Sequence, residues 1–486
     1  MLRTITQILI YTRPWEVRFH LALARQLEGV HPGVPVVFYT FFRHAYDQVL
    51  SAGRRCVYFP QALAEVSVAG VGDERLGQID DELAQAGLGN LLLQFHAERF
   101  RPADRLAQQD MLRRHVAVLD AAVRPGTLGI SSMFDHFVYW LAGSLAEARN
   151  GAHFAFVGAP MPPGRVQALR TPWEQWVGPE VPEADSLYDS CRAQQSLPPE
   201  QRIAYMRPET IPPLRRRWRE RLREVQDDLA DRRAGAYFGP ASFTWRKSVE
   251  TRWRRIFPAN DDAQYDLRTP EEVRGFSHRS VYVPLHMEPE ATILMYSPWL
   301  QNQVEMCRLV SQALPPDVWM LVKENPKMIG ARSAQFFRDI KAIPNLRLVH
   351  PTVNPFVMTE KCDLTITLAG TAALEAKLLG KRVAMLARPP HAFVLESDEI
   401  LGVEIKAAQI QRLLRRAPKE MSRSHWHRFI RGTFVGQAVP VWGTARYELD
   451  SSEENARQYS GYIAACLSQP ADNERDPSAR LVRPSN

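Results

Sequence analysis

Four short segments in the second half of the chain carry residue types that bind phosphate or move protons. They cover residues 284–290 (Pro-Leu-His-Met-Glu-Pro-Glu), 322–326 (Val-Lys-Glu-Asn-Pro), 351–355, and 368–375 (Leu-Ala-Gly-Thr-Ala-Ala-Leu-Glu). Each segment follows a short apolar run of the kind that forms a buried strand. Because ligands of open parallel sheets bind beyond the carboxyl ends of the strands, we expect these segments to build one binding site.

The segment 368–375 has the clearest physical basis for binding an anion. Gly370 lets the backbone approach a ligand closely, and Thr371 offers a helix cap and a hydroxyl group. The N–H groups of Thr371, Ala372 and Ala373 would face outward at the positive end of a helix, where phosphate binds well. One turn further on, Glu375 is placed to accept hydrogen bonds from ribose hydroxyls. The alternative is a plain helix start with no ligand.

The other segments supply charge and acid–base groups. Lys323 is a cation at a strand end that would neutralise phosphate, unless it is an ordinary surface lysine. His286 lies in a loop between prolines, where it would donate to a leaving phosphate or a sugar oxygen; the alternative is a structural histidine. Glu288 and Glu290 are candidates for orienting a donor or for acting as a base.

The elements that must position these residues alternate regularly along the chain. In the second half we expect five strands with helices between them, the strands at residues 280–284, 318–323, 346–349, 364–368 and 382–386. In the first half we expect strands at residues 7–12, 34–40, 55–59, 127–131 and 154–158. A long helical region is expected at about 73–123, and Pro-rich irregular structure after 158. This alternation predicts an α/β protein with two doubly wound parallel sheets.

The ordered motifs of the second half resemble the capsule polysaccharide biosynthesis family. The resemblance covers residues 280–390 and rests on the runs at 282–292, 321–326, 343–349, 368–376 and 380–383. That family looks like a branch of the GT-B glycosyltransferases, which have two Rossmann-type lobes facing a cleft, and it includes enzymes that add Kdo from CMP-Kdo. Where the family pattern has His-Pro after Lys-Glu, this chain has Asn325-Pro326, and an Asn side chain cannot carry a proton or a charge.

The resemblance implies an inverting sugar transfer without a metal or other cofactor, from a CMP- or UDP-linked donor to a glycan or lipid-linked acceptor. The second lobe would stabilise the departing nucleotide, and a carboxylate or histidine of the first lobe would take the acceptor proton. Asp135, which follows the strand at 127–131, is the candidate base, and His136 is the second candidate. Asp135 as the N-cap of the next helix is the alternative. Arg13, after the first strand, is a further candidate for lining the cleft; the alternative is a solvent-exposed arginine.

Composition argues against several other classes of protein. The length of 486 residues fits two domains, and 45% hydrophobic with 24% charged residues is typical of a soluble globular protein. No apolar run approaches the ~20 residues of a membrane span, and the N-terminus does not resemble a signal peptide, so we expect a cytoplasmic location. The five cysteines are far apart with no C-x-x-C pair, which argues against a disulfide framework or a zinc site.

The net charge of +7 is concentrated in one stretch. Residues 211–257 hold twelve arginines and one lysine against six acids, an excess equal to that of the whole chain. Two interpretations are open for the region from Arg215 to Arg255: a solvated helix packed on a domain, or a peripheral contact with the inner face of the cell membrane. Because the chain outside residues 211–257 is close to neutral, nucleic acid is not an expected partner.

Together these observations predict five parts of the chain. They are an acceptor-side lobe (1–205), an Arg-rich helical insert (206–275), a nucleotide-sugar lobe (276–450), a C-terminal helix (451–467) and a disordered tail (468–486). The expected function is a glycosyltransferase of bacterial surface polysaccharide synthesis. One alternative is a sugar-nucleotide epimerase of the same fold, which needs acid–base residues around the sugar but no acceptor. The other is a non-catalytic assembly subunit, which Asn325 and the Arg-rich insert favour.

Overall fold

The computed structural model describes residues 3–97, 105–134, 136–202, 261–288, 291–329, 332–402, 404–438 and 449–469. Asp135, Glu290, the Arg-rich stretch 211–257 and the tail beyond 469 lie outside the described residues. The chain forms two compact units. Of the described residues, the first unit contains 3–180 and 431–469, and the second contains 181–202 and 261–430. Residues 181–202 were expected in the first lobe and belong to the second unit. Residues 431–438 were expected in the second lobe and belong to the first unit.

The first unit contains a mixed sheet with strand order β13-β6-β5-β4-β1-β2-β3. Five of its strands pair with one another in parallel and lie close to the predicted positions: β1 (Gln7–Tyr11), β2 (Val36–Thr40), β3 (Cys56–Tyr58), β4 (Thr127–Ser131) and β5 (Ala152–Gly158). Three further strands pair antiparallel: β6 (Arg165–Thr171), β7 (Glu174–Gln175) and β13 (Thr433–Val435). The expectation of irregular structure after 158 was therefore wrong. Every residue of β6 is buried, and its arginines and glutamine hid the apolar pattern of a core strand.

The helices in the N-terminal part of this unit are α1 (Val17–Val30), α2 (Arg43–Ser51), α3 (Phe59–Glu65), α4 (Asp73–Gln85), α5 (Leu91–Ala97), α6 (Arg105–Ala122) and α7 (Phe137–Ala148). The helical region expected at 73–123 is interrupted between α4 and α5, where Gly87 and Gly89 adopt positive φ angles of 73° and 101°. The predicted C-terminal helix is confirmed as α19 (Glu453–Leu467), which packs on α1 with the Phe19 and Tyr459 rings 4.7 Å apart.

The second unit contains a five-stranded, fully parallel sheet: β8 (Arg279–Pro284), β9 (Val318–Lys323), β10 (Leu346–Val349), β11 (Leu364–Thr367) and β12 (Val383–Met385). The strand order is β10-β9-β8-β11-β12. The chain therefore moves outward from β8 to β10, then crosses back to β11 on the other side of β8. This reversal makes the carboxyl ends of β8 and β11 the switch point of the sheet, where ligands of such folds bind.

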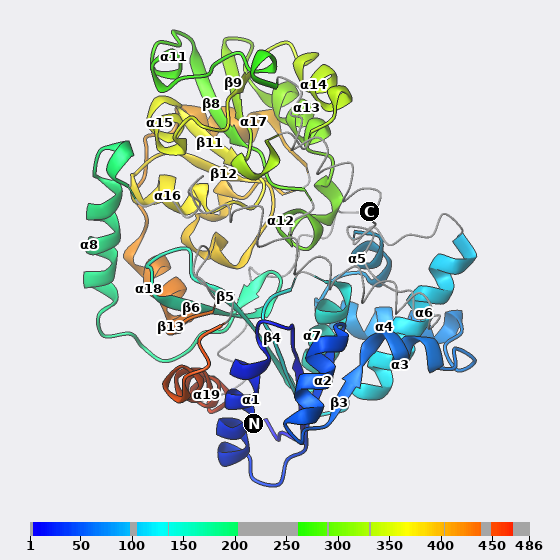
Figure 1. The fold of residues 1–486 in the computed structure, drawn as a ribbon. Coiled ribbons are helices and arrows are strands. Elements are labelled where there is room, and N and C mark those ends of the chain that lie inside the picture. Colours follow the sequence, from blue (N-terminus) through cyan, green and yellow to red (C-terminus); the bar gives the residue numbers. More distant parts are fainter. Residues whose placement is uncertain are drawn as a thin grey trace. The chain divides into compact units, whose positions relative to one another are not determined.

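The helices of this unit are α8 (Ala184–Gln195), α11 (Pro270–Arg274), α12 (Ala291–Leu294), α13 (Gln303–Ala313), α14 (Ala334–Lys341), α15 (Pro355–Lys361), α16 (Ala372–Leu378), α17 (Ala407–Arg415) and α18 (Arg423–Arg431) (Figure 1). The predicted fold class, two doubly wound Rossmann-like α/β units, is confirmed. No helix in the described part of the chain combines the length and apolar character needed to cross a bilayer. All five cysteines are free thiols.

Candidate functional site

The switch point of the second unit brings His286 and Gly370 together. His286 follows β8 and Gly370 follows β11, so the loops that carry them leave neighbouring strands at the same edge of the sheet. A Cβ atom at position 370 would lie 3.1 Å from Cε1 of His286. The His286 side chain is buried. The loop after β8 and the turn after β11 therefore lie next to each other at His286 and Gly370.

The turn from β11 into α16 differs in detail from the expected phosphate cradle. The Gly370 N–H donates to Oγ1 of Thr367 at 3.0 Å, and the Ala373 N–H donates to the Gly370 carbonyl at 3.3 Å. The expectation that the Ala373 N–H is available was wrong, because the helix has already begun there. Thr371 is the N-cap residue, but its side chain makes no capping hydrogen bond. In the described part of the chain, only the N–H groups of Thr371 and Ala372 remain for a ligand at this turn.

Glu375 lies one turn into α16 and is buried. Burial raises its pKa to about 7, although a hydrogen bond from Thr371 and the charge of Arg202 act in the opposite direction. The hydroxyl of Thr371 therefore serves Glu375 instead of the helix backbone. A carboxyl group with this pKa can exchange a proton near neutral pH, which makes it suited to both hydrogen bonding and acid–base chemistry.

His391 is a member of the site that the sequence did not single out. It lies in a 3-10 helix (Pro390–Val394) after β12, and its Nε2 is 3.4 Å from the Gly370 carbonyl oxygen. Burial lowers the pKa of His391 to about 4, with a smaller contribution from the nearby His286 in the same direction and one from the Gly370 carbonyl in the opposite direction. Applying the strand-end rule to the strand predicted at 382–386 would have found this histidine.

The backbone of His286 is held by one buried side chain. The His286 N–H donates to Oε1 of Gln303 at 2.6 Å, and Nε2 of Gln303 donates back to the His286 carbonyl at 3.0 Å. Gln303 is the first residue of α13 and is 1% exposed, so these two bonds are shielded from water. Gln303 thus satisfies both backbone hydrogen-bonding groups of His286, as the backbone of a neighbouring strand would do, and this holds the loop after β8 in place.

An ion-pair network supports the same loop from the other side. Arg332 donates to the His286 carbonyl at 3.0 Å, forms two hydrogen bonds with the Glu324 carboxylate at 2.8 and 3.2 Å, and pairs with Glu288 at 3.0 Å. The Glu324 side chain is completely buried. Glu288 therefore has a structural role in this network. Nothing in the residue spacing indicates the network, because Arg332 belongs to no periodic pattern.

The remaining candidates of the segment 322–326 make framework contacts. Nζ of Lys323 donates to the carbonyls of Pro351 at 3.0 Å and Glu324 at 3.3 Å, and burial lowers its pKa to about 8. Oδ1 of Asn325 accepts from the Lys327 N–H and caps a short 3-10 helix that begins at Pro326. Among the described residues, no hydrogen bond or ion pair joins Lys323, Asn325 or Pro326 to the turn at Gly370.

In the first unit, Arg13 and His136 converge on one tyrosine. Arg13 follows β1 with its guanidinium carbon 5.2 Å from the Tyr139 ring centre, and the His136 ring lies 5.6 Å from the same ring. The strands β1 and β4, which precede these residues, are neighbours at the point where the order of that sheet reverses. The described residues contain no group of three or more His, Cys, Asp or Glu side chains arranged to hold a metal ion.

No family model and no curated protein matches the chain. Among solved structures, it is similar to the Thermosulfurimonas dismutans KpsC beta Kdo 2,7 transferase, with 11% identity, coverage of 75% of this chain and 90% of that one, and a TM-score of 0.29. A glycosyltransferase from Rickettsia africae ESF-5 has 9% identity, coverage of 96% and 100%, and a TM-score of 0.26. A UDP-GlcNAc 2-epimerase from Neisseria meningitidis has 13% identity, coverage of 95% and 99%, and a TM-score of 0.23. These values are too low to transfer a substrate or a reaction to this chain.

Proposed function

We propose that the chain is a nucleotide-sugar glycosyltransferase of bacterial surface polysaccharide synthesis, with the donor bound by the second unit. The observation that carries this proposal is the gathering of His286, Gly370, Thr371 and Glu375 around the switch point of a parallel sheet. Sheets of this kind bind nucleotide-type ligands in that position. The resemblance of residues 280–390 to the capsule polysaccharide family makes CMP-Kdo the first donor to test.

In this proposal the second unit stabilises the leaving nucleotide. The N–H groups of Thr371 and Ala372 would receive phosphate oxygens, and Glu375 would accept hydrogen bonds from ribose hydroxyls. His286 would donate a proton or a hydrogen bond to the leaving phosphate oxygen as its bond to the anomeric carbon breaks. Lys323 would act through the field of its charge, since its ammonium group is already bonded to two carbonyls.

The acceptor hydroxyl would form the new bond to the anomeric carbon and lose its proton to a base. We retain Asp135 as the proposed base and His136 as the second candidate. Attack on the face opposite the leaving nucleotide makes the transfer inverting, and no step in this scheme requires a metal ion. The acceptor would be a glycan or a lipid-linked glycan, as the family resemblance implies.

The decisive experiment measures donor hydrolysis and transfer with CMP-Kdo and with a panel of UDP- and GDP-sugars, alongside calorimetric binding of CMP, UDP and GDP. We expect one nucleotide to bind and its sugar conjugate to turn over. Asp135→Ala should abolish turnover while nucleotide binding is kept, whereas Glu375→Ala should weaken binding. Absence of both binding and turnover with every nucleotide would contradict the proposal and favour a non-catalytic subunit.

A second candidate function, a sugar-nucleotide epimerase, is favoured by one observation. Three titratable side chains, His286, His391 and Glu375, gather around Gly370 within a single unit. Removing a proton from a sugar carbon and returning it to the other face needs such a set, and needs no acceptor. Product analysis of UDP-sugars incubated without acceptor separates the two: a product of changed configuration favours the epimerase, and its absence removes this candidate.

A further inference from the structure

A groove lined by three arginines runs along the outer face of α17. Its lining consists of Ala408, Gln411, Arg412, Arg415 and Arg416, and it encloses about 460 Å³ while remaining open to solvent. The apolar side of α17, formed by Ile410, Leu413 and Leu414, is buried in the core of the second unit. The helix is therefore fixed, and its arginine side is held at the surface.

The positive charge of this groove is only partly neutralised. The Arg416 guanidinium contacts both carboxylate oxygens of Asp398 at 3.0 Å. Arg412 and Arg415 are exposed, and neither contacts a carboxylate within the described part of the chain. A fourth guanidinium lies beside them, because Nε of Arg382 donates to the Arg416 carbonyl. Two uncompensated cations thus share one wall with two further arginines.

The groove is separate from the candidate donor site. Arg382 directly precedes β12 and so marks the amino edge of the parallel sheet, and its contact with Arg416 places the end of α17 at that edge. His286 and Gly370 follow their strands and mark the carboxyl edge. Because the two sites lie at opposite ends of the same strands, a ligand in the groove would not compete with a nucleotide at the switch point.

We propose that this groove binds the phosphate groups of an anionic lipid surface. Guanidinium groups match phosphate oxygens in a two-point geometry. The lining contains no aromatic ring on which a nucleic-acid base would stack, and its one apolar side chain is the methyl group of Ala408, too little for the core of a protein interface. A groove this open cannot bury a small ligand, whereas many weak charge contacts suffice for binding a surface.

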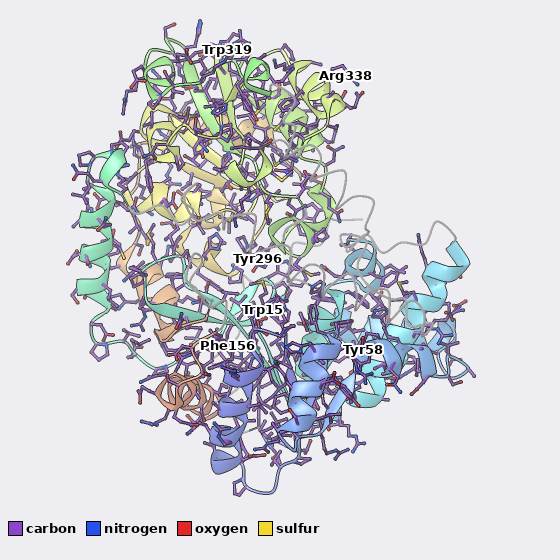
Figure 2. The ribbon with its side chains drawn as sticks, viewed as in Figure 1. Trp15, Tyr58, Phe156, Tyr296, Trp319 and Arg338 are labelled. Atoms are coloured by element: carbon purple, nitrogen blue, oxygen red, sulfur yellow. The ribbon has the colours of Figure 1, made fainter. Side chains whose placement is uncertain are left out.

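The test is binding of the intact chain to phosphatidylcholine vesicles with and without phosphatidylglycerol. The variant is Arg412→Gln/Arg415→Gln. The control is Arg308→Gln/Arg338→Gln, which removes the same charge from α13 and α14; Arg338 is labelled at the surface of the second unit in Figure 2. We expect the groove variant to bind phosphatidylglycerol vesicles about thirtyfold more weakly, the control to bind like the parent, and binding to fall at about 0.5 M salt.

Three outcomes would overturn the proposal. Equal losses in the two variants would show that net charge alone matters, and unchanged binding in both would show that other residues hold the membrane. Complete displacement of the chain from the vesicles by inorganic phosphate, at the protein concentrations used for vesicle binding, would show that the groove is a site for small anions and not a contact with a membrane surface. The groove variant and the parent should turn over the donor at the same rate when acceptor and vesicles are left out. The vesicle-binding result is therefore independent of the test of the proposed function.

Discussion

Gly370 lies so close to His286 that a methyl group at position 370 would sit 3.1 Å from Cε1 of the imidazole and 2.8 Å from the hydroxyl oxygen of Thr367. The backbone angle at Gly370 is not in the left-handed region, so the need for glycine here is one of space and not of conformation. The contact makes the turn after β11 and the loop after β8 depend on each other, and the first prediction tests that dependence.

Gly370→Ala should push His286 or Thr367 out of place. We expect a loss of about 1–3 kcal/mol in the free energy of unfolding from overpacking, and about tenfold weaker binding of the preferred nucleotide. Denaturant unfolding and calorimetric titration measure these effects. Gly461→Ala is the matched control, because nothing lies within 4 Å of a Cβ at this position in α19. It should stabilise the protein by about 0.5–1 kcal/mol. Identical behaviour of the two variants would contradict the prediction.

The burial of Glu375 predicts a pH dependence of stability. Its pKa is 4.5 without the environment of the fold and about 7 within it, so folding takes up a proton between these values. The stability that Glu375 contributes is therefore present below pH 4.5 and is lost as the pH rises through 7, by up to about 3 kcal/mol. Glu375→Gln, which cannot ionise, should match the parent at pH 4.5 and be more stable at pH 8.

Urea unfolding at the two pH values measures the Glu375 effect. Glu454→Gln on the exposed side of α19 is the control, since the Glu454 carboxylate is largely solvated and contacts the exposed side chains of Arg457 and Gln458. It should change the stability little at either pH. If the difference in stability between Glu375→Gln and the parent did not vary with pH, burial would not raise the pKa of the Glu375 carboxyl group.

The sequence predicted the sheet of the second unit well because each strand is a short apolar run ended by polar or Pro-containing loops. The bounds of β9 and β10 agree with the predicted ranges, and the rule that neighbouring strand ends lie together correctly placed His286 beside Gly370. The rule could not find Gln303 or Arg332. Their roles come from tertiary contacts with a backbone distant in the sequence, and such contacts leave no periodic pattern.

Gln303→Ala should loosen the loop that carries His286. The variant removes both side-chain bonds to the His286 backbone and leaves a buried N–H without an acceptor, which costs about 2–3 kcal/mol. We expect weaker nucleotide binding and a changed or broadened His286 ring resonance in NMR spectra. Gln335→Ala on the exposed face of α14 is the control and should change neither. A Gln303→Ala variant that is destabilised but has an unchanged His286 resonance and unchanged nucleotide affinity would mean that Gln303 has only a structural role.

The buried pair of Arg332 and Glu324 allows stability to be separated from positioning. Arg332→Met leaves the fully buried Glu324 carboxylate without its cation and should cost about 3–5 kcal/mol. Arg332→Met/Glu324→Leu removes both charges and should recover most of that loss, as measured by denaturant unfolding. Because Arg332 also donates to the His286 carbonyl, the double variant should still bind nucleotide more weakly than the parent. If nucleotide affinity returned together with stability, the contact between Arg332 and His286 would have no part in holding the site.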